Sequence, residues 1–347
     1  MQIDLALIGF GHVARRFVRL LWEQRDRLDR RHNLTCRIVA IATSRHGSLV
    51  QPEGIDVDAA LARIESGETL GIGDTFVGAT DSVDLIRFVA ARARPLVIVE
   101  TTPLDIRDGQ PALDHVRTAL AAGADVITAN KGPVAFAYRE LQDLADSGGR
   151  SFLFEATVMD GVPIFSLVRD TLPVVLVTGF RGVINSTTNH ILTQMEIGQS
   201  FDAALTEMQR AGIAESDASL DVDGWDAAAK TAALANVLLD ARLTPHLVDR
   251  TGIGQVSADA VRRAVERGRR IRLIASAHRN NGQVVGRVAP IEIDEHSPLA
   301  MLKGMQNALV LETDMLGEVA VTELSAGLTQ TAYALLSDLV TVRRRLV

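Results

Sequence analysis

Residues 3–14 read Ile-Asp-Leu-Ala-Leu-Ile-Gly-Phe-Gly-His-Val-Ala, an apolar run that leads directly into a Gly-x-Gly-x-x-Ala motif. The run predicts a buried strand, and the helical spacing of apolar residues over 13–28 predicts a helix after it. Gly9 allows a tight turn, and Gly11 lets the backbone approach a pyrophosphate at the helix N-terminus. The motif therefore predicts dinucleotide binding, with an ordinary glycine-rich turn as the alternative. The residues expected at the coenzyme are Gly9, Phe10, Gly11, His12 and Val13.

Further apolar runs, at residues 36–42, 96–100 and 125–128, alternate with helical patterns such as that at 111–122. Strands that alternate with helices predict a parallel sheet with helices on both faces. Beyond residue 135 this alternation is lost. Strand-like runs lie at 152–155, 174–177 and 283–288, and helical patterns lie at 199–211, 225–241, 258–268 and 327–342. The patterns predict an α/β protein with a Rossmann-type dinucleotide-binding domain and an α+β second domain.

The composition excludes several classes of protein. Of 347 residues, 47% are hydrophobic and 23% are charged, which is typical of a globular protein and not of a disordered one. The net charge of −7 gives no reason to expect nucleic acid or a membrane surface as a partner. Cys36 is the only cysteine, which excludes a disulfide framework and favours a reducing, cytoplasmic location.

The segment after the second strand indicates the type of coenzyme. Proteins that bind NAD usually carry an Asp or Glu there, which holds the ribose hydroxyls. Residues 42–47 read Ala-Thr-Ser-Arg-His-Gly and contain no carboxylate. Arg45 is placed to meet a 2′-phosphate, so the sequence favours NADP over NAD. A simple loop cation is the alternative for Arg45.

The densest group of polar residues lies at 215–230. Asp226 and Lys230 are four residues apart and share one face of a predicted helix. A helix capped by Asp223, with an exposed ion pair, would explain part of the cluster. Glu215, Asp217 and Asp221 are not needed for such a cap, so their excess suggests a substrate with a cationic group.

A second lysine follows the strand at 125–128, in the segment Asn130-Lys131. Parallel α/β sheets bind ligands at the carboxyl ends of their strands, so Lys131 is a candidate for proton transfer together with Lys230. A surface loop lysine is the alternative.

Taken together, these motifs resemble those of the homoserine dehydrogenase family. The likeness covers nearly the whole chain, in order. It includes Gly9–Ala14, Val99–Pro103, Thr128–Lys131, Glu155–Val158, Gly182–Leu192 and the spacing of Glu215, Asp221, Asp226 and Lys230. The resemblance implies the NAD(P)-dependent interconversion of L-homoserine and L-aspartate 4-semialdehyde, on the route to threonine and methionine.

The resemblance also implies roles for individual residues. Lys230 and Lys131 would transfer protons, and Asp226 would hold the substrate or orient Lys230. The substrate would contact Glu215, Asp221, Thr187 and Ser186. Further coenzyme contacts would come from Ser44, Arg45, Thr101, Thr102, Lys131 and Gly327. A sodium ion would lie on the backbone carbonyls of Glu155, Val158, Asp160 and Val162.

At the level of domains, the resemblance implies an NAD(P)-binding domain over 1–135, completed by the C-terminal helix at about 310–347. A catalytic and dimerisation domain would occupy 136–309 and form a homodimer through its sheet. A C-terminal regulatory ACT domain, which longer relatives carry, is not expected in 347 residues.

Four positions depart from the family pattern. Met159-Asp160 replaces Gly-Gly, Ser186 replaces Gly, Ile213 replaces Tyr, and residues 323–327 replace a glycine-rich segment. Two alternatives therefore stay open: a dehydrogenase of another amino-acid alcohol or aldehyde, and a relative that binds coenzyme without catalysis.

Overall fold

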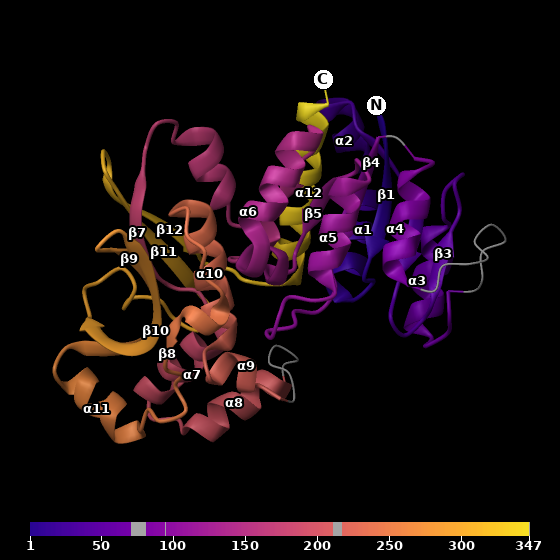
Figure 1. Ribbon diagram of the computed structural model, residues 1–347. Helices are drawn as coiled ribbons and strands as arrows, with labels where there is room; N and C mark the ends of the chain where they lie inside the picture. The colour runs from indigo at the N-terminus through magenta and orange to yellow at the C-terminus, as the bar shows by residue number, and fades with distance from the viewer. Residues whose placement is uncertain (71–80, 94, 211–216, 347) are drawn as a thin grey trace. The chain divides into compact units, whose positions relative to one another are not determined.

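The computed structural model describes residues 1–70, 81–93, 95–210 and 217–346. The chain folds into two compact units (Figure 1). The first unit comprises Met1–Gly161 together with Gly327–Val347, and the second comprises Val162–Ala326. No helix in the described part of the chain is long and apolar enough to cross a membrane.

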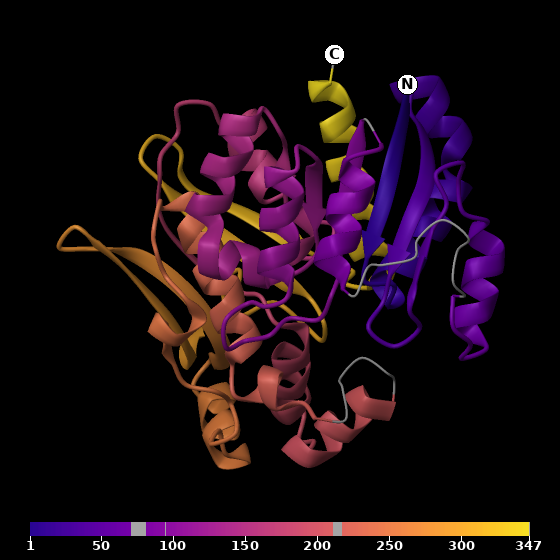
Figure 2. The same ribbon diagram turned by 45° about the vertical axis from the view of Figure 1, so that its right-hand side comes forward.

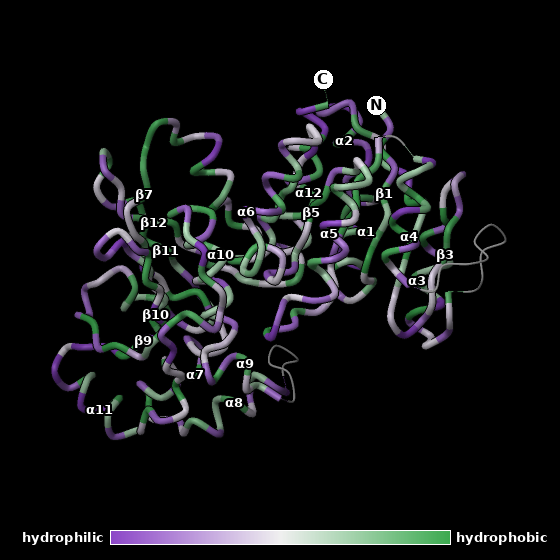
Figure 3. Tube along the Cα trace, in the orientation of Figure 1, coloured by the Kyte–Doolittle hydropathy of each residue, from purple (hydrophilic) through white to green (hydrophobic). Residues whose placement is uncertain are grey.

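The first unit is built on a six-stranded sheet in the order β3-β2-β1-β4-β5-β6. Its strands are β1 (Gln2–Ile8), β2 (Thr35–Ala42), β3 (Ser48–Val50), β4 (Leu96–Glu100), β5 (Asp125–Thr128) and β6 (Phe152–Leu153). All neighbours run parallel except β3, which pairs antiparallel with β2. β1 is hydrophobic along most of its length because it is the buried centre of the sheet (Figure 3). This arrangement confirms the predicted Rossmann-type fold.

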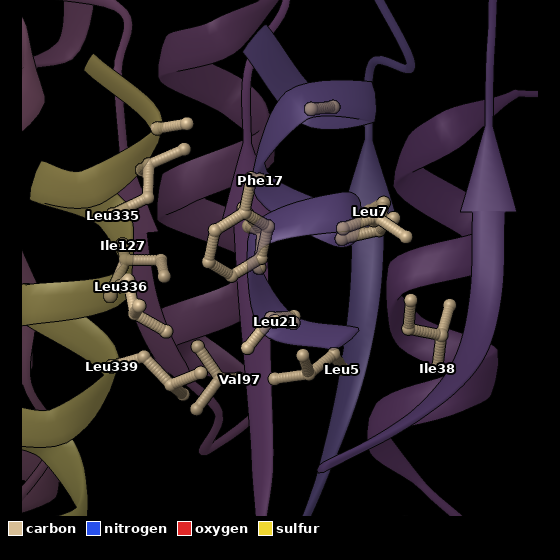
Figure 4. Close-up of a cluster of buried hydrophobic side chains, with 14 of the residues drawn as sticks. Leu5, Leu7, Phe17, Leu21, Ile38, Val97, Ile127, Leu335, Leu336 and Leu339 are labelled. Atoms are coloured by element: carbon tan, nitrogen blue, oxygen red, sulfur yellow. The ribbon is translucent and has the colours of Figure 1, made fainter. Parts of the chain in front are cut away.

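Helices pack on both faces of this sheet. They are α1 (His12–Glu23), α2 (Arg25–His32), α3 (Val57–Glu65), α4 (Ser82–Ala90), α5 (Ala112–Ala121), α6 (Lys131–Gly148) and α12 (Leu328–Arg345). On one face, α1 and α12 lie against each other, and Phe17 of α1 packs beside Leu335 and Leu339 of α12 (Figure 4). The same core takes in Leu5, Leu7 and Val97 from the strands. The C-terminal helix therefore completes the hydrophobic core of the first unit.

The first turn of α12 is held by residues from far earlier in the chain. The Asp160 carboxylate accepts hydrogen bonds from the backbone N–H of Gly327, at 2.7 Å, and from Thr331 Oγ1, at 2.9 Å. Gly161 lies so close that a Cβ there would be 2.7 Å from the carbonyl oxygen of Gln330. Asp160 thus supplies the cap that no residue next to the helix provides.

The boundaries of the units lie later in the chain than those drawn from the sequence at residues 135 and 310. The difference at the first boundary arises because α6 and β6 extend the first unit, with β6 pairing beside β5. At the second boundary, two strands over 307–323 pair with the sheet of the second unit, and only the helix beyond them returns to the first.

The second unit contains a six-stranded, mainly antiparallel sheet in the order β12-β11-β7-β9-β10-β8. Its strands are β7 (Val177–Val183), β8 (Asp249–Arg250), β9 (Arg269–Asn280), β10 (Gln283–Asp294), β11 (Asn307–Thr313) and β12 (Gly317–Glu323). β9 and β10 form a long hairpin (Figure 2). Its helices are α7 (Ser186–Glu196), α8 (Phe201–Arg210), α9 (Ser219–Val222), α10 (Trp225–Leu238) and α11 (Ala258–Glu266). This is the α+β architecture predicted for the second part of the chain.

The strand predicted at 174–177 is wrong, since β7 begins only at Val177. Val174 has a left-handed backbone with φ of +69°, which turns the chain in place of extending it. The turn is fixed from the β11–β12 connection, where Asp314 accepts a hydrogen bond from the backbone N–H of Leu176 at 2.9 Å. The run of β-branched residues predicted a strand because this distant contact is invisible in the local pattern.

Candidate functional site

The turn between β1 and α1 leaves backbone amides available to a ligand. Gly9 has a φ of +89°, and Gly11 is the N-cap of α1. Among the residues that the structure describes, no side chain caps this helix, and no atom lies within 4 Å of where a Cβ of Gly11 would stand. The first turn of α1 also carries no acidic residue. An anion such as a pyrophosphate can therefore reach the positive end of the helix.

The other residues of the motif face in different directions. Phe10 is 5% exposed and belongs to the hydrophobic core, so only its backbone can meet a ligand. His12 is exposed, and Val13 is half-buried against the core. The backbone turn of the motif is therefore exposed, while the buried side chain of Phe10 packs it against the hydrophobic core.

The turn after β2 places Ser44 and Arg45 at the surface. Thr43 closes this turn, because its backbone N–H donates to the carbonyl of Gly47 at 2.9 Å and its hydroxyl accepts from the backbone N–H of His46 at 2.8 Å. Both exposed residues lie at the carboxyl end of β2, the strand next to β1. Arg45 is exposed, and no ion pair joins it to another described residue.

Three more residues that the sequence predicts at the coenzyme follow the carboxyl ends of β4 and β5. Thr101 is joined to β1, since its backbone N–H donates to the carbonyl of Ile8 at 2.8 Å and its hydroxyl donates to that of Gly9 at 3.1 Å. Thr102 follows it, and Lys131 is the first residue of α6. The carboxyl ends of adjacent strands therefore bring these residues to one edge of the sheet, together with the glycine turn. Gly327 lies elsewhere, at the start of α12.

In the second unit, Asn185 joins the two carboxylates of the predicted substrate cluster. Its side-chain amide donates to Asp221 Oδ1 at 2.7 Å and to Asp226 Oδ2 at 3.0 Å, while its Oδ1 caps α7 by accepting from the backbone N–H of Thr188. Lys230 Nζ lies 3.2 Å from Asp226 Oδ2 and donates to the carbonyl of Ile184 at 2.8 Å. Asp221, Asp226 and Lys230 therefore form one connected cluster with Asn185.

The cluster is shielded from solvent. The side chains of Lys230 and Asp226 are only 15% and 17% exposed, so their ion pair is not the surface pair that helix capping alone would produce. Burial and then the nearby Asp226 carboxylate raise the pKa of Asp221, against the lowering effect of hydrogen bonds from Asn185 and Thr187 and of the Lys230 charge. Two acids held together beside one lysine form a site that prefers an additional positive charge.

Thr187 and Ser186 lie in the first turn of α7, next to this cluster. Thr187 is buried and hydrogen-bonded to Asp221. Ser186 Oγ accepts a hydrogen bond from Asn307 Nδ2 at 2.9 Å, and the same amide donates to Glu323 Oε2 at 2.7 Å. Two of the departures from the family pattern, Ser186 and Glu323, are therefore linked through one buried asparagine.

The rest of the acidic segment differs from its sequence-based interpretation. Glu215 and Ile213 lie outside the described residues. Asp217 is exposed and accepts a hydrogen bond from the backbone N–H of Ser219 at 3.0 Å. Asp223 does not cap α10, because Gly224, with φ of +81°, occupies the N-cap position. Of the acids that the structure describes, Asp221 and Asp226 are the ones brought to Lys230.

The residues expected around sodium begin in a 3₁₀ turn, Glu155–Thr157. Glu155 is buried, and its backbone N–H donates to Asp338 of α12 at 2.9 Å. The side chain of Asp160 is engaged with α12, and Val162 begins the second unit. In the described part of the chain, no three His, Cys, Asp or Glu side chains gather in a way that could hold a metal ion.

The sequence interpretation did not assign a role to two residues that the structure places at the centre of these sites. Asn185 had a usable signal, since an asparagine before a helix is a typical N-cap, but its contacts with Asp221 and Asp226 had none. Glu100 is fully buried at the end of β4 and accepts hydrogen bonds from Thr102 and Thr128. Each residue makes at least one contact with a residue far away in the sequence.

Comparison with known proteins identifies the family. A model described as homoserine dehydrogenase matches residues 163–340, and the model for the NAD-binding domain of homoserine dehydrogenase matches residues 9–155. The chain belongs to the homoserine dehydrogenase family. Members of this family are NAD(P)-dependent oxidoreductases. They interconvert L-homoserine and L-aspartate 4-semialdehyde.

Individual relatives are similar in sequence to this protein along nearly its full length. An NAD(+)-dependent homoserine dehydrogenase of Pseudomonas canavaninivorans is 36% identical over 345 residues, covering 99% of this chain and 97% of the relative. A homoserine dehydrogenase of Methanocaldococcus jannaschii is 35% identical over 342 residues, covering 97% and 98%. The crystal structure of a homoserine dehydrogenase from Thiobacillus denitrificans has a TM-score of 0.81 at 30% identity, covering 99% of this chain and 74% of that one.

The half-buried carboxylate of Asp221 predicts a conflict between stability and activity. Because folding raises the pKa of Asp221, the folded state favours its protonated form, so stability falls as the pH rises through the range between the unfolded and folded pKa values. Asp221→Asn should therefore raise Tm at neutral pH and flatten its pH dependence, while lowering kcat/KM for homoserine about 10²-fold through loss of a charged hydrogen bond. Calorimetry across mildly acidic to neutral pH and steady-state kinetics measure both effects.

Asp217→Asn is the matched control, because it removes an exposed acid from the same segment. Hydrogen bonds from Ser219 lower the pKa of Asp217, so this substitution should slightly lower stability at neutral pH and leave kcat/KM for homoserine unchanged. Equal losses of activity in the two variants would show that the segment contributes only bulk negative charge.

Proposed function

We propose that homoserine is held at the cluster of Asp221, Asn185, Asp226 and Lys230. The substrate ammonium would lie against Asp221, whose half-buried carboxylate beside Asp226 would be stabilised by a nearby cation. The substrate hydroxyl would lie at Lys230, whose Nζ is oriented by Asp226 Oδ2 and the carbonyl of Ile184. Support for this proposal comes from the Asn185 amide, which holds both carboxylates at fixed positions.

In oxidation, the Lys230 amine would take the proton of the substrate hydroxyl, and in reduction the ammonium would return it to the developing alkoxide. When bound, the nicotinamide coenzyme supplies the hydride acceptor or donor. The first unit would hold its pyrophosphate on the amides of the Gly9–Gly11 turn, with Thr101, Thr102 and Lys131 along the same edge. We assign Lys131 to proton transfer or to the contact with substrate and coenzyme.

A substrate that lacks the ammonium group tests the proposed substrate position. With 4-hydroxybutyrate, the wild-type kcat/KM should fall about 10²-fold below that for homoserine, because Asp221 loses its ionic partner. Asp221→Asn should discriminate between the two substrates much less. Unchanged discrimination in the variant would place the ammonium at another residue.

We propose that NADP is the preferred coenzyme. Support comes from Arg45, which is exposed at the end of β2, and from the lack of a carboxylate in residues 42–47. Arg45→Ala should lower kcat/KM for NADP about 10–100-fold, because one charged hydrogen bond to the 2′-phosphate is lost. The kcat/KM for NAD should stay nearly unchanged. Steady-state kinetics with both coenzymes measure the ratio.

Arg92→Ala is the matched control for Arg45. Arg92 is an exposed arginine that precedes β4, at the amino end of the strands of the same sheet. Its removal changes the net charge by the same amount and should leave the ratio of kcat/KM for NADP over NAD unaltered. A higher kcat/KM for NAD in the wild-type protein would refute the proposed preference.

We also propose that sodium binds the backbone carbonyls of Glu155, Val158, Asp160 and Val162. Support comes from the family resemblance of this segment and from its turn, in which Asp160 has φ of +43°. Activity should then rise with NaCl but not with KCl at equal ionic strength. Equal activity in the two salts would contradict this part of the proposal.

We propose a cytoplasmic homodimer that associates through the sheet of the second unit. Support comes from the family resemblance and from the edge strand β12, on which Ala320 and Thr322 are exposed. Sedimentation velocity should give the mass of two chains, and a monomer at assay concentrations would contradict it. Burial raises the pKa of the one cysteine, Cys36, to about 12, which keeps its thiol protonated.

A further inference from the structure

The end of β4 holds a carboxylate that none of the proposed roles uses. Glu100 has no exposed surface, although an ionised carboxylate is costly to bury unless donors surround it. Its Oε1 accepts hydrogen bonds from the backbone N–H of Thr102, at 3.0 Å, and from the Thr102 hydroxyl. Its Oε2 accepts from the Thr128 hydroxyl at 3.0 Å. The two oxygens of one carboxylate therefore join the ends of two neighbouring strands.

The second of these ends leads directly to Lys131. Thr128 Oγ1, which donates to Glu100, accepts from the backbone N–H of Asn130 at 2.9 Å. The Asn130 side chain then donates to the carbonyl of Thr102 at 2.9 Å and accepts from the backbone N–H of Gly132 at 2.8 Å. The carboxylate, Thr102, Thr128 and Asn130 therefore form a closed ring of hydrogen bonds. Lys131 follows Asn130 directly and is spanned by the bond from Gly132 to Asn130.

A buried histidine from the helices that cover the sheet also lies beside Glu100. His115 of α5 is 2% exposed, and its Nδ1 lies 3.6 Å from Glu100 Oε1. The other ring nitrogen, Nε2, is hydrogen-bonded to Ser82 Oγ of α4 at 2.6 Å. A buried imidazole therefore lies beside Glu100, while the hydrogen bonds of the carboxylate run to the two loops.

We propose that Glu100 is a positioning residue of the dehydrogenase, which sets the Thr101–Thr102 loop at the coenzyme and the Asn130–Lys131 loop in one fixed geometry. The part that concerns Lys131 rests on the role proposed for that lysine. The part that concerns Thr102 does not, so the two can be tested apart. A purely structural carboxylate would stabilise the fold without affecting either loop.

Glu100→Gln keeps the size of the side chain but replaces one acceptor oxygen with an NH2 donor. This donor would face the Thr128 hydroxyl, which donates a hydrogen bond to the carboxylate in the wild type. The substitution should raise the dissociation constant for NADPH about tenfold and lower kcat about 10–100-fold, the effect of a small misplacement of reacting groups. Asp125→Asn is the control. Asp125 is 3% exposed at the opposite end of β5, where it accepts a hydrogen bond from the backbone N–H of Ser151, and burial raises its pKa. The neutral amide should therefore leave Tm at neutral pH no lower than that of the wild type and kcat within about twofold.

A double-mutant cycle with Lys131→Met decides whether Glu100 acts through the lysine. If it does, Glu100→Gln should lower the residual kcat of Lys131→Met by less than about threefold. An undiminished effect in that background would overturn the link to Lys131. A wild-type kcat in Lys131→Met alone would instead refute the role of the lysine, while the NADPH dissociation constant of Glu100→Gln still tests the Thr102 loop.

Substitutions of Thr128 keep the test decisive if Glu100→Gln fails to fold. Thr128→Val removes the hydroxyl that connects Glu100 to Asn130 and should reproduce the loss of kcat, whereas Thr128→Ser retains the hydroxyl and should restore it. If both variants keep kcat within about twofold of the wild type, or if Glu100→Gln lowers Tm alone, the positioning role is refuted.

Discussion

Gly9→Ala should abolish coenzyme binding and destabilise the first unit. An alanine at a φ of +89° costs about 1–2 kcal/mol, and its Cβ would lie 2.8 Å from the carbonyl carbon of Thr101 and 2.9 Å from the backbone nitrogen of Thr102. Because backbone atoms cannot move aside as a flexible side chain can, we expect a total loss of about 3 kcal/mol or more. Chemical denaturation and titration with NADPH measure the two effects.

Gly11→Ala separates the effect on binding from the effect on folding. Gly11 has φ of −77°, and no described atom lies within 4 Å of its Cβ position, so alanine fits the folded protein. The added methyl group would nevertheless occupy the space through which the pyrophosphate approaches. This variant should keep the wild-type stability and bind NADPH about 10²-fold more weakly. Tight NADPH binding by both variants would show that the coenzyme does not use this turn.

Lys230→Met should lower kcat about 10³-fold in both directions of the reaction. Positioned acid–base groups typically contribute 10²–10⁴-fold, and methionine keeps the apolar stem of lysine while removing the Nζ that contacts Asp226 and the carbonyl of Ile184. The dissociation constant for NADPH should change by less than about twofold, because the glycine turn belongs to the other unit. Steady-state kinetics with homoserine and with aspartate semialdehyde measure kcat.

Lys303→Met is the matched control for this substitution. Lys303 belongs to the same unit but is exposed, between β10 and β11. Its replacement should leave kcat within about twofold of the wild type, as is usual for a distant surface change. A kcat in Lys230→Met above about one tenth of the wild-type value would remove the lysine from the chemistry.

Features that depend on local sequence were predictable. The alternation of buried strands with amphipathic helices follows from spacing alone, and so does the glycine turn between β1 and α1. The pairing of Asp226 with Lys230 was predictable too, since residues four apart on a helix face each other. In each case, the interacting residues lie within one element or at its junction with the next.

Features that depend on distant contacts were not predictable in this way. The cap that Asp160 provides for α12 joins residues 167 positions apart, and no local pattern marks it. β6 was predicted as a strand but not as a member of the first sheet, because sheet membership is set by pairing with β5. The ring of hydrogen bonds around Glu100 likewise joins two strand ends that only the folded sheet brings together.

We propose that homoserine is oxidised at Lys230, with its ammonium at Asp221 and the lysine oriented by Asp226. The most direct measurement is a single-turnover experiment, in which protein loaded with NADP and L-homoserine is followed by the absorbance of reduced nicotinamide. We expect the wild-type protein to form reduced coenzyme and aspartate semialdehyde in equal amounts, and Lys230→Met to do so about 10³-fold more slowly although both ligands bind. An equal single-turnover rate in the two proteins would contradict it.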